Sequence, residues 1–511
     1  MITLREWLAQ NQVYLDPRLA IDQSRPSSTR IVVGASSSLP PNETVARIPK
    51  SCILSRRTSS LSKFTQQVPG QLLLQLESLT PPLQLSVHVL YEIAIASRSK
   101  WYGYFANCPK EIVDIALLWE LEGEAQKWIG GTELELELRR IRIDRTALRQ
   151  IFNSLVLPLF ASLPSTPLSS LRLALDLLLY SYSLVSSRSF QIDNNYHQLA
   201  LVPLADAFNH LGPGENQVEF VVDGDGGGWV CEACGSAREC RHDREDDGDS
   251  KPFDESFEAR IIALSLRRSE GGTDREDESY EMVTTEASGP LKIGEEVFNS
   301  YGNLSNARLI AEYGFKLEAN EADRITFSRD ELEAVMRETG LFQGGYSADC
   351  ARKEEQEEVE EDHPLIMARS LLPDEPRFEF FFDADAKISN SLWRTLVYAA
   401  ILESSNLSKC LEQIFARDQD DNYETPVDGI DPSNCPSLLR IAHTIDRLCE
   451  RRVRNQFRPQ LTSSQLLDLA EAELDERLRL AIAFLAEERL LLERVKEKWR
   501  IVQRATGHLV H

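Results

Sequence analysis

Tyr301-Gly302-Asn303-Leu304-Ser305-Asn306-Ala307, followed by Glu312-Tyr313-Gly314-Phe315, places two tyrosines twelve residues apart. Upstream of the first tyrosine, residues 295–298 (Glu-Glu-Val-Phe) predict a short strand. Residues 305–311 predict a short helix whose first turn Ser305 can cap. Two phenol hydroxyls could therefore meet in one pocket. The alternative is that both are ordinary half-buried aromatic residues whose hydroxyls bind a nearby acceptor.

The length and charge of the chain limit its architecture and its partners. At 511 residues it is too long for one hydrophobic core, so we expect two or three domains. The formal net charge of -25 argues against nucleic acid and anionic membranes as partners and favours a basic protein. Two acidic runs, at 244–249 and 354–362, are more typical of solvated loops than of binding sites.

The sequence carries no sign of a membrane span or an export signal. It has no run of about eighteen or more apolar residues, and its N-terminus lacks a basic segment followed by an apolar core. We therefore expect the protein in the cytoplasm, the nucleus or both. The nine cysteines are mostly scattered, unlike those of a secreted disulfide framework.

Hydrophobic periodicity separates strand-rich parts of the chain from helical ones. Short β-branched segments between 31 and 54 predict a small antiparallel meander. From 83 to 189 the spacing of apolar residues becomes helical. Strands are predicted again at 199–202, 218–222, 257–266 and 295–298. A β-rich part that is split in sequence could thus be one sheet system in space.

Beyond about residue 320 the chain is predicted to be helical again. Its last segment, 464–500, carries an apolar stripe with Glu and Arg on the opposite face, which predicts one long amphipathic helix. We expect this stripe to pack on its own helical domain. The alternative is a partner-binding helix.

Four motifs follow one another in order: 185–190 (VSSRSF), 201–210 (LVPLADAFNH), 295–302 (EEVFNSYG) and 313–315 (YGF). Together they resemble the SET-domain protein methyltransferases. The branch includes RuBisCO large-subunit lysine methyltransferases, SETD6-like enzymes and fungal ribosomal-protein lysine methyltransferases. Residues 39–44 and 48–51 resemble the family's first hairpin, and 100–105 and 130–134 resemble its helical insert.

This resemblance implies an α+β fold. Residues 1–24 would form an N-terminal helical segment, and 25–320 a β-rich SET domain of short strands. The SET domain would contain a helical insert at 85–197 and a cysteine-rich loop at 223–255. Residues 321–511 would form an all-α domain similar in character to the family's substrate-binding domain.

The resemblance also implies a site for S-adenosylmethionine. Arg188 would pair with the methionine carboxylate, a task suited to a planar guanidinium. The backbone of Asn209 and His210 would hold the adenine end, and Phe315 would pack on the adenine ring.

Three further residues would line the methyl-transfer pore. Tyr301 matches the family's catalytic tyrosine and would also contact the cofactor, and Tyr313 would share the pore with it. Asp206 would orient the target side chain or the Asn-His turn. In-line transfer needs alignment and exclusion of water, and an apolar channel favours the neutral form of a lysine, whose ordinary pKa is about 10.4.

We therefore expect a lysine N-methyltransferase acting on a non-histone protein, for instance a ribosomal protein. Two alternatives remain open. A histidine-directed methyltransferase of the same fold is compatible with the same motifs. A catalytically silent scaffold is favoured by one departure, because Arg30 and Val32 stand where the family has a glycine pair that lets the backbone approach the cofactor. The sequence does not indicate an oligomeric state.

One cluster of metal-ligating residues falls outside the four motifs. Cys231, Cys234, Cys240 and His242 form a C-x2-C-x5-C-x-H pattern. Four such donors suit one tetrahedral zinc that closes a polar loop, and since the protein would fill every position, the zinc would be structural. Reduced loop thiols and a redox pair are the alternatives.

Overall fold

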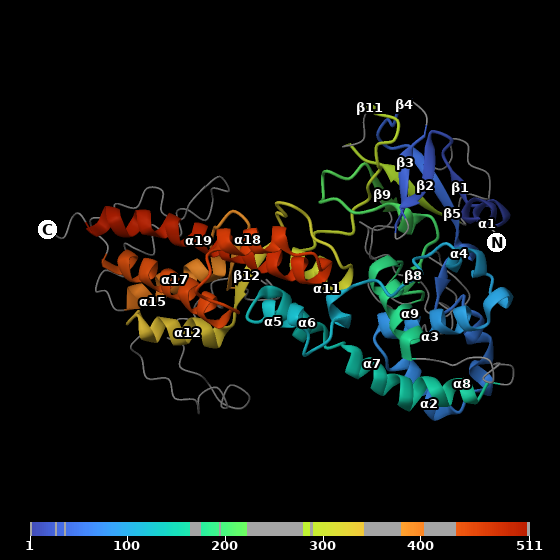
Figure 1. The fold of residues 1–511 in the computed structure, drawn as a ribbon, viewed down its shortest axis with the longest axis horizontal. Helices are drawn as coiled ribbons and strands as arrows, with labels where there is room; N and C mark the ends of the chain where they lie inside the picture. Colours follow the sequence, from blue (N-terminus) through green and yellow to red (C-terminus); the bar gives the residue numbers. More distant parts are fainter. Residues whose placement is uncertain are drawn as a thin grey trace, which may run out of the picture. The chain divides into compact units, whose positions relative to one another are not determined.

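The computed structural model describes residues 3–25, 28–34, 37–163, 175–193, 196–221, 279–286, 290–341, 380–402 and 436–507. The chain divides into two compact units. The first comprises 1–118, 142–304 and 311–314, and the second comprises 119–141, 305–310 and 315–511. Part of the expected helical insert, residues 119–141, thus belongs with the C-terminal residues rather than with the SET domain. Figure 1 shows the elements of both units.

The first unit begins with one short helix and then a series of strands: α1 (Leu4–Gln10), β1 (Tyr14–Leu15), β2 (Leu19–Arg25), β3 (Ser28–Val33), β4 (Ser37–Ser38), β5 (Thr44–Pro49) and β6 (Leu54–Ser55). Thr3 caps α1 in a reciprocal hydrogen-bond pair with Glu6, and Trp7 is among the residues that α1 buries. Only part of the expected helical segment 1–24 is therefore helical, because β1 and most of β2 lie within it.

The predicted meander between 31 and 54 is wrong. Consecutive strands go to different sheets: β3 pairs with β2, β5 lies between β1 and β10 (Ser279–Thr284), and β6 pairs with β8 (Leu199–Leu201). The remaining strands of this unit are β7 (Ser189–Gln191), β9 (Val218–Val221) and β11 (Pro290–Leu291). Alternating apolar residues set which face of a strand is buried, but they do not select its partner strand.

The other strand predictions have mixed outcomes. The strands expected at 199–202 and 218–222 are confirmed as β8 and β9. The segment expected to be a strand at 295–298 does not form a continuous strand. It pairs with β3 through one isolated antiparallel bridge, between Glu296 and Val32. The segment 257–266 lies outside the described residues.

The helical part of the first unit confirms the periodicity of 83–189. Its helices are α2 (Gly70–Glu77), α3 (Pro81–Ala94), α4 (Tyr102–Phe105), α7 (Arg145–Ile151), α8 (Leu157–Ala161) and α9 (Leu175–Arg188). Helix α3 is buried on nearly all sides and packs against α9. Because Arg188 is the last residue of α9, this packing fixes the backbone position from which its side chain extends.

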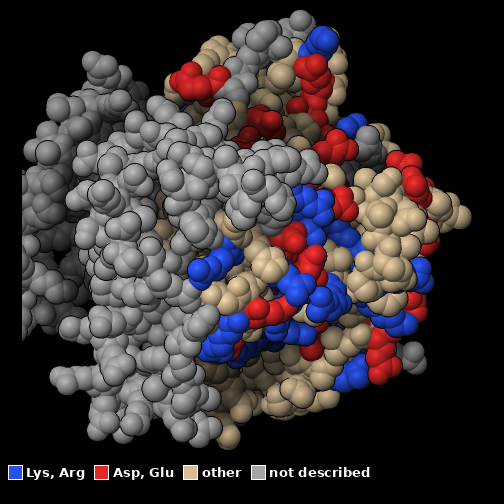
Figure 2. Space-filling model, turned by 90° about the vertical axis from the view of Figure 1, so that its left-hand side faces the viewer, with Lys and Arg blue, Asp and Glu red and all other residues tan. Residues whose placement is uncertain are grey.

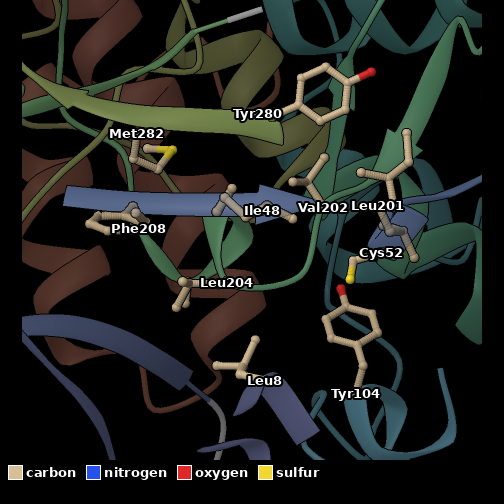
Figure 3. Packing of buried hydrophobic residues seen from close by; sticks show 14 of the residues in the cluster. Leu8, Ile48, Cys52, Tyr104, Leu201, Val202, Leu204, Phe208, Tyr280 and Met282 are labelled. Carbon is tan, nitrogen blue, oxygen red and sulfur yellow. The ribbon is translucent and has the colours of Figure 1, made fainter. Parts of the chain in front are cut away.

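The core of the first unit supports the turn at 204–208. Ile48 of β5 lies opposite Tyr280 of β10, and Met282, Phe208 and Leu204 belong to the same buried cluster (Figure 3). Phe208 is completely buried. Hydrophobic burial of this kind contributes about 1.5–3 kcal/mol for each large side chain, so the turn is anchored by apolar packing before any polar contact is counted.

The second unit is mainly helical. Its elements are α5 (Glu124–Trp128), α6 (Glu133–Ile141), β12 (Arg324–Phe327), α12 (Arg329–Glu338), β13 (Phe380–Asp383), α15 (Asn390–Leu402), α17 (Pro436–Asn455), α18 (Ser463–Ala472) and α19 (Glu476–Gly507). The antiparallel pair β12–β13 is a two-stranded sheet that the all-α expectation did not include.

The single long helix predicted over 464–500 is wrong, because the chain breaks between α18 and α19. Glu473 is extended, and Asp475 accepts a hydrogen bond from the backbone N–H of Leu478, which caps α19. Leu474 lies in the break and is 93% exposed. The apolar periodicity continues across the break. The extended backbone of Glu473 ends α18, and the side chain of Asp475 caps the start of α19.

A buried charge cluster joins α6 to the helices of this unit. Arg452 of α17 donates to Glu133 of α6, and its Nε lies 3.0 Å from Glu488 of α19. Glu488 also accepts from the backbone N–H of Glu133 at 2.8 Å. Residues 119–141 therefore have specific polar partners within the second unit, for which their sequence gave no signal.

The surface carries both signs of charge. Figure 2 shows Lys and Arg side chains gathered on one face with Asp and Glu side chains among them. In the second unit, Arg447 pairs with Glu338 and Glu450. Among the described residues, no helix has the length and apolar character needed to cross a membrane.

Candidate functional site

The site of the first unit is built where three distant parts of the chain meet. On one side, the backbone N–H of Val33 in β3 binds the carbonyl of Glu295 at 2.8 Å. On the other side, the N–H of Asn299 binds the carbonyl of Asn209 at 2.7 Å, and the N–H of Leu211 binds the carbonyl of Asn299 at 3.0 Å. His210 and Asn299 thus form a parallel β-bridge, and Tyr301 follows Asn299 by two residues.

The ring of Tyr301 stacks with two other rings. Its ring stacks on His210 with centroids 4.8 Å apart and on Tyr313 with centroids 5.1 Å apart. Its hydroxyl donates to the carbonyl of Phe208 at 3.3 Å, and its backbone N–H donates to Nδ1 of His210 at 3.0 Å. Four contacts therefore define both the plane of the ring and the position of its oxygen.

The rings of the two tyrosines are therefore in contact, whereas convergence of their hydroxyls on one pocket stays a prediction. Helix α11 (Asn306–Glu312) connects them, and the Ser305 hydroxyl accepts from the N–H of Arg308, which confirms the predicted cap. Gly314 follows Tyr313 with φ +79°, and a Cβ there would lie 2.5 Å from the carbonyl oxygen of Asp114. Only glycine fits this conformation and this approach, which explains the Tyr-Gly pair.

Beside this stack lies a buried polar group centred on Asp206. Nη1 of Arg188 donates to the carbonyl of Asp206 at 3.0 Å and to its Oδ2 at 3.1 Å. The hydroxyl of Tyr104 donates to the same Oδ2 at 2.7 Å. The Asp206 side chain keeps 5% of its exposure and that of Arg188 keeps 17%. The carboxylate therefore sets the guanidinium in place, and the pair needs both partners.

The turn that presents Asp206 is strained. Leu204 adopts φ 82° and ψ -46°, a left-handed conformation that costs a non-glycine residue of order 1–3 kcal/mol. Only 1% of Leu204 is exposed, so its apolar packing offsets that cost. Strain of this kind is typical of functional turns.

Burial controls the ionisation of the site. It raises the pKa of the Tyr301 phenol, although Arg188 acts in the opposite direction. Burial also opposes the charge of Arg188, but Asp206 together with smaller contributions from Cys108, Tyr104 and Tyr301 outweighs burial, so the pKa of the guanidinium rises. Burial lowers the pKa of His210 to about 4. At neutral pH, Tyr301 is a neutral phenol and His210 a neutral imidazole whose Nδ1 accepts a hydrogen bond.

Six of the residues expected in the site lie in the first unit, and the contacts join them in two sets: Arg188 with Asp206, and Tyr301 with Tyr313, His210 and the adjoining Asn209. Phe315 belongs to the second unit, directly after Gly314, and its contact with an adenine ring stays a prediction. The four zinc-ligand candidates, Cys231, Cys234, Cys240 and His242, lie outside the described residues. Among the described residues, no cluster of His, Cys, Asp or Glu is arranged to hold a metal.

Three residues of the site were not expected from the sequence. Tyr104 and Glu296 bind Asp206 and Asn209 through their side chains. The amide oxygen of Asn299 is buried and accepts no hydrogen bond from any described residue. Each was part of a motif, but only long-range pairing reveals its partner.

The curated relatives of this chain are lysine methyltransferases and a SET-domain protein. Ribosomal lysine N-methyltransferase 3 of Saccharomyces cerevisiae is 31% identical over 214 residues, which cover 35% of this chain and 37% of the relative. N-lysine methyltransferase setd6 of Xenopus laevis is 25% identical, with 58% of this chain and 54% of the relative covered. The chain thus spans about a third to a half of these relatives. No family model matches the sequence.

Two further comparisons cover most of the chain. Protein SET DOMAIN GROUP 40 of Arabidopsis thaliana is 22% identical over 83% of this chain and 73% of its own length. The solved SET domain of LSMT bound to lysine and AdoHcy superposes with a TM-score of 0.55 at 16% identity, covering 99% of this chain and 92% of that one. The chain therefore has the SET-domain fold, and it is similar in sequence to lysine methyltransferases over part of its length. The proteins it resembles are Rubisco LSMT, SETD6 and the yeast ribosomal enzyme.

The residues of this site fit S-adenosylmethionine, the cofactor bound in a solved structure of Rubisco LSMT. The contacts of Arg188 with Asp206 use Nη1, and Nη2 takes no part in them. In the parallel bridge with Asn299, the backbone groups of His210 itself point away from Asn299. The buried amide oxygen of Asn299 lacks a donor among the described residues, which a polar ligand would supply. These three features provide a cation, a backbone edge and an acceptor for a zwitterionic nucleoside.

Proposed function

We propose that this protein is an S-adenosylmethionine-dependent protein lysine N-methyltransferase that acts on a non-histone protein of basic character. A ribosomal protein is the substrate class we favour, because the relative with 31% identity is named for ribosomal lysine methylation. The formal net charge of -25 supports a basic partner.

The observation that carries this proposal is the position of the Tyr301 hydroxyl. The phenol is neutral because burial raises its pKa, its ring is fixed by His210 and Tyr313, and its oxygen lies 3.3 Å from the carbonyl of Phe208. Two oxygens at this spacing can hold a neutral amine and face a polarised methyl group. A phenol with a raised pKa is a poor base at neutral pH, so its role is to orient rather than to remove a proton.

Bound S-adenosylmethionine would supply a methyl group on a sulfonium, and the transfer forms an N–C bond as the S–C bond breaks. Arg188 would pair with the carboxylate of the cofactor, and the backbone of Asn209 and His210 would hold its adenine end. Asp206 keeps Arg188 oriented for this task through Oδ2. Holding the two reactants in line is worth about 7–11 kcal/mol in favourable systems.

We propose separately that Cys231, Cys234, Cys240 and His242 hold one structural zinc. Their spacing provides four donors within twelve residues, all of which the metal would use. Metal analysis of purified protein should find close to one zinc per chain. A Cys234→Ser variant should lose the zinc, and far less than one zinc per several wild-type chains would remove the proposal.

Calorimetric titration with S-adenosylmethionine tests the enzymatic proposal. We expect wild-type protein to bind at micromolar concentration and Arg188→Met to bind at least about tenfold more weakly, since it loses the charge that meets the carboxylate. If the protein is a catalytically silent scaffold, neither wild type nor Arg188→Met should show heat of binding on titration with S-adenosylmethionine. Supplying peptides that contain lysine or histidine in the transfer reaction then distinguishes the two acceptors.

A further inference from the structure

Arg30 stands where the family has a glycine, and its side chain is engaged on both sides. Its Nη2 lies 2.8 Å from Oδ2 of Asp22, and its Nη1 lies 3.3 Å from Oε2 of Glu296. The other oxygen of Glu296, Oε1, accepts from the side-chain amide of Asn209 at 2.5 Å. These four side chains form an unbroken chain of contacts, the Arg30 relay, that ends at a residue of the candidate cofactor site.

Strand pairing brings the members of the Arg30 relay together. Asp22 of β2 lies directly opposite Arg30 of β3. The other edge of β3 pairs with the segment that contains Glu296, because Val32 and Glu296 form an antiparallel bridge. Arg30 lies two residues from Val32 and therefore faces the same side of the sheet as Glu296. The contact is thus fixed by the backbone and not by flexible side chains meeting at the surface.

The Arg30 relay acts on a backbone that is already held from one side. The carbonyl of Asn209 accepts from the N–H of Asn299 at 2.7 Å, while Glu296 binds the amide of the same residue. The Glu296 side chain retains 15% of its exposure. A carboxylate this buried needs a balancing cation to stay oriented, and Arg30 is the cation that contacts it.

We propose that Arg30 is a positioning residue, which acts through Glu296 on Asn209 to set the Asn209-His210 backbone for the nucleoside end of S-adenosylmethionine. The inference rests on the proposed function. The departure from the family then has a different meaning, because the side chain that replaces the glycine holds the Asn209-His210 backbone through Glu296.

Arg30→Ala should raise the dissociation constant for S-adenosylmethionine about tenfold. Turnover at saturating cofactor should stay within about threefold, because Arg30 touches neither the amine nor the methyl group. Arg30→Lys keeps the charge but lacks the planar fork that binds two carboxylates. Its dissociation constant for S-adenosylmethionine should lie between those of wild type and Arg30→Ala. A purely structural role would lower the melting temperature without this split between affinity and turnover.

Arg30→Gly restores the family's residue and separates two explanations. The Arg30 relay predicts weaker cofactor binding, as for Arg30→Ala. If the missing glycine were the limitation, Arg30→Gly would bind the cofactor more tightly than wild type, and the relay would be overturned. The matched control is Arg18→Ala. Arg18 pairs with Asp16 at 2.8 Å and Glu43 at 2.6 Å, and its loss should leave cofactor affinity unchanged.

A double-mutant cycle of Arg30→Ala with Asn209→Ala tests the direction of action. Because the proposed effect of Arg30 passes through the Asn209 side chain, the two losses of affinity should be strongly non-additive. Additive losses, or wild-type affinity in Arg30→Ala, would overturn the inference and leave the proposed function standing. If wild-type protein binds no S-adenosylmethionine, the proposed function fails first and the inference fails with it.

Discussion

The rings of Tyr301 and Tyr313 are stacked, with centroids 5.1 Å apart and planes inclined by 24°. Helix α11 lies between them in the sequence, and the ring of His210 also stacks on Tyr301. The stack leaves the Tyr301 ring little freedom to rotate. Its hydroxyl is therefore placed by packing as well as by the hydrogen bond to Phe208.

Removing the ring of Tyr313 should impair transfer more than cofactor binding. Stacked aromatic pairs contribute about 0.5–1.5 kcal/mol, and misplacement of a reacting group by about 1 Å can cost about 10²-fold in rate. We expect Tyr313→Ala to lower kcat at least about tenfold and Tyr313→Phe, which keeps the ring face, to retain more activity. Steady-state methyl-transfer kinetics measure both, and an unchanged kcat in Tyr313→Ala would show that the stack does not position Tyr301.

Asp206 and Tyr104 should contribute to stability as a pair. Asp206→Ala leaves the largely buried Arg188 without its carboxylate, which should cost about 3 kcal/mol, at the low end because Arg188 keeps some exposure. Tyr104→Phe loses a hydrogen bond to a charged acceptor, worth about 1.5–3 kcal/mol. Denaturant unfolding measures both. Tyr102→Phe on the same helix is the control, since Tyr102 is 46% exposed and should shift stability by less than about 0.5 kcal/mol.

His88 should weaken the fold in acid. Burial lowers its pKa to about 3, and nearby Arg56 acts in the same direction. Its Nδ1 has no hydrogen-bond partner among the described residues. Because the folded pKa is below the unfolded value of about 6.5, protons bind the unfolded chain first. The stabilisation is complete above about pH 6.5 and falls towards pH 3 by at most about 1.4 kcal/mol per pH unit.

His88→Met removes this titration while keeping an apolar side chain of similar length. The free energy of unfolding of the variant should fall less steeply than that of wild type between pH 6.5 and 4, whatever the offset at pH 7.5. Equal slopes for the two proteins would show that His88 is not held neutral by burial.

Arg452 should be essential to the second unit. Arg452→Met leaves two buried carboxylates, Glu133 and Glu488, without their cation, which should cost about 3–5 kcal/mol. Arg447→Met on the same helix removes partly exposed ion pairs and should cost no more than about 1 kcal/mol. Urea unfolding of the full chain compares them. Similar losses in both variants would contradict a special role for the buried cluster.

The sequence grouped residues that the structure brings into contact, but it did not predict the paths of the strands, and the roles of those residues in a cofactor site stay predictions. Tyr301, Arg188 and the Asn-His pair were predicted because local motifs surround them, whereas the partners of β3 and β5 were missed. Alternating apolar residues report burial of one face, and a partner strand some 230 residues away leaves no local trace.

The contacts between side chains were the least predictable part. Nothing local links Tyr104 to Asp206 or Arg30 to Glu296, since each pair joins segments that only the folded sheet brings together. The break at Glu473 and Leu474 was missed for a related reason. The apolar stripe runs across it, and the cap by Asp475 competes with that pattern.

Incubation with labelled S-adenosylmethionine and basic ribosomal proteins, comparing wild type with Tyr301→Phe, tests the central claim most directly. We expect wild type to label lysine side chains, and Tyr301→Phe to bind the cofactor normally yet transfer about 10²- to 10³-fold more slowly, as when one oriented donor is lost. Equal labelling by both proteins would remove Tyr301 from the chemistry. No labelling by a wild-type protein that binds the cofactor, across ribosomal and other basic proteins, would contradict the account of this site as a lysine methyltransferase.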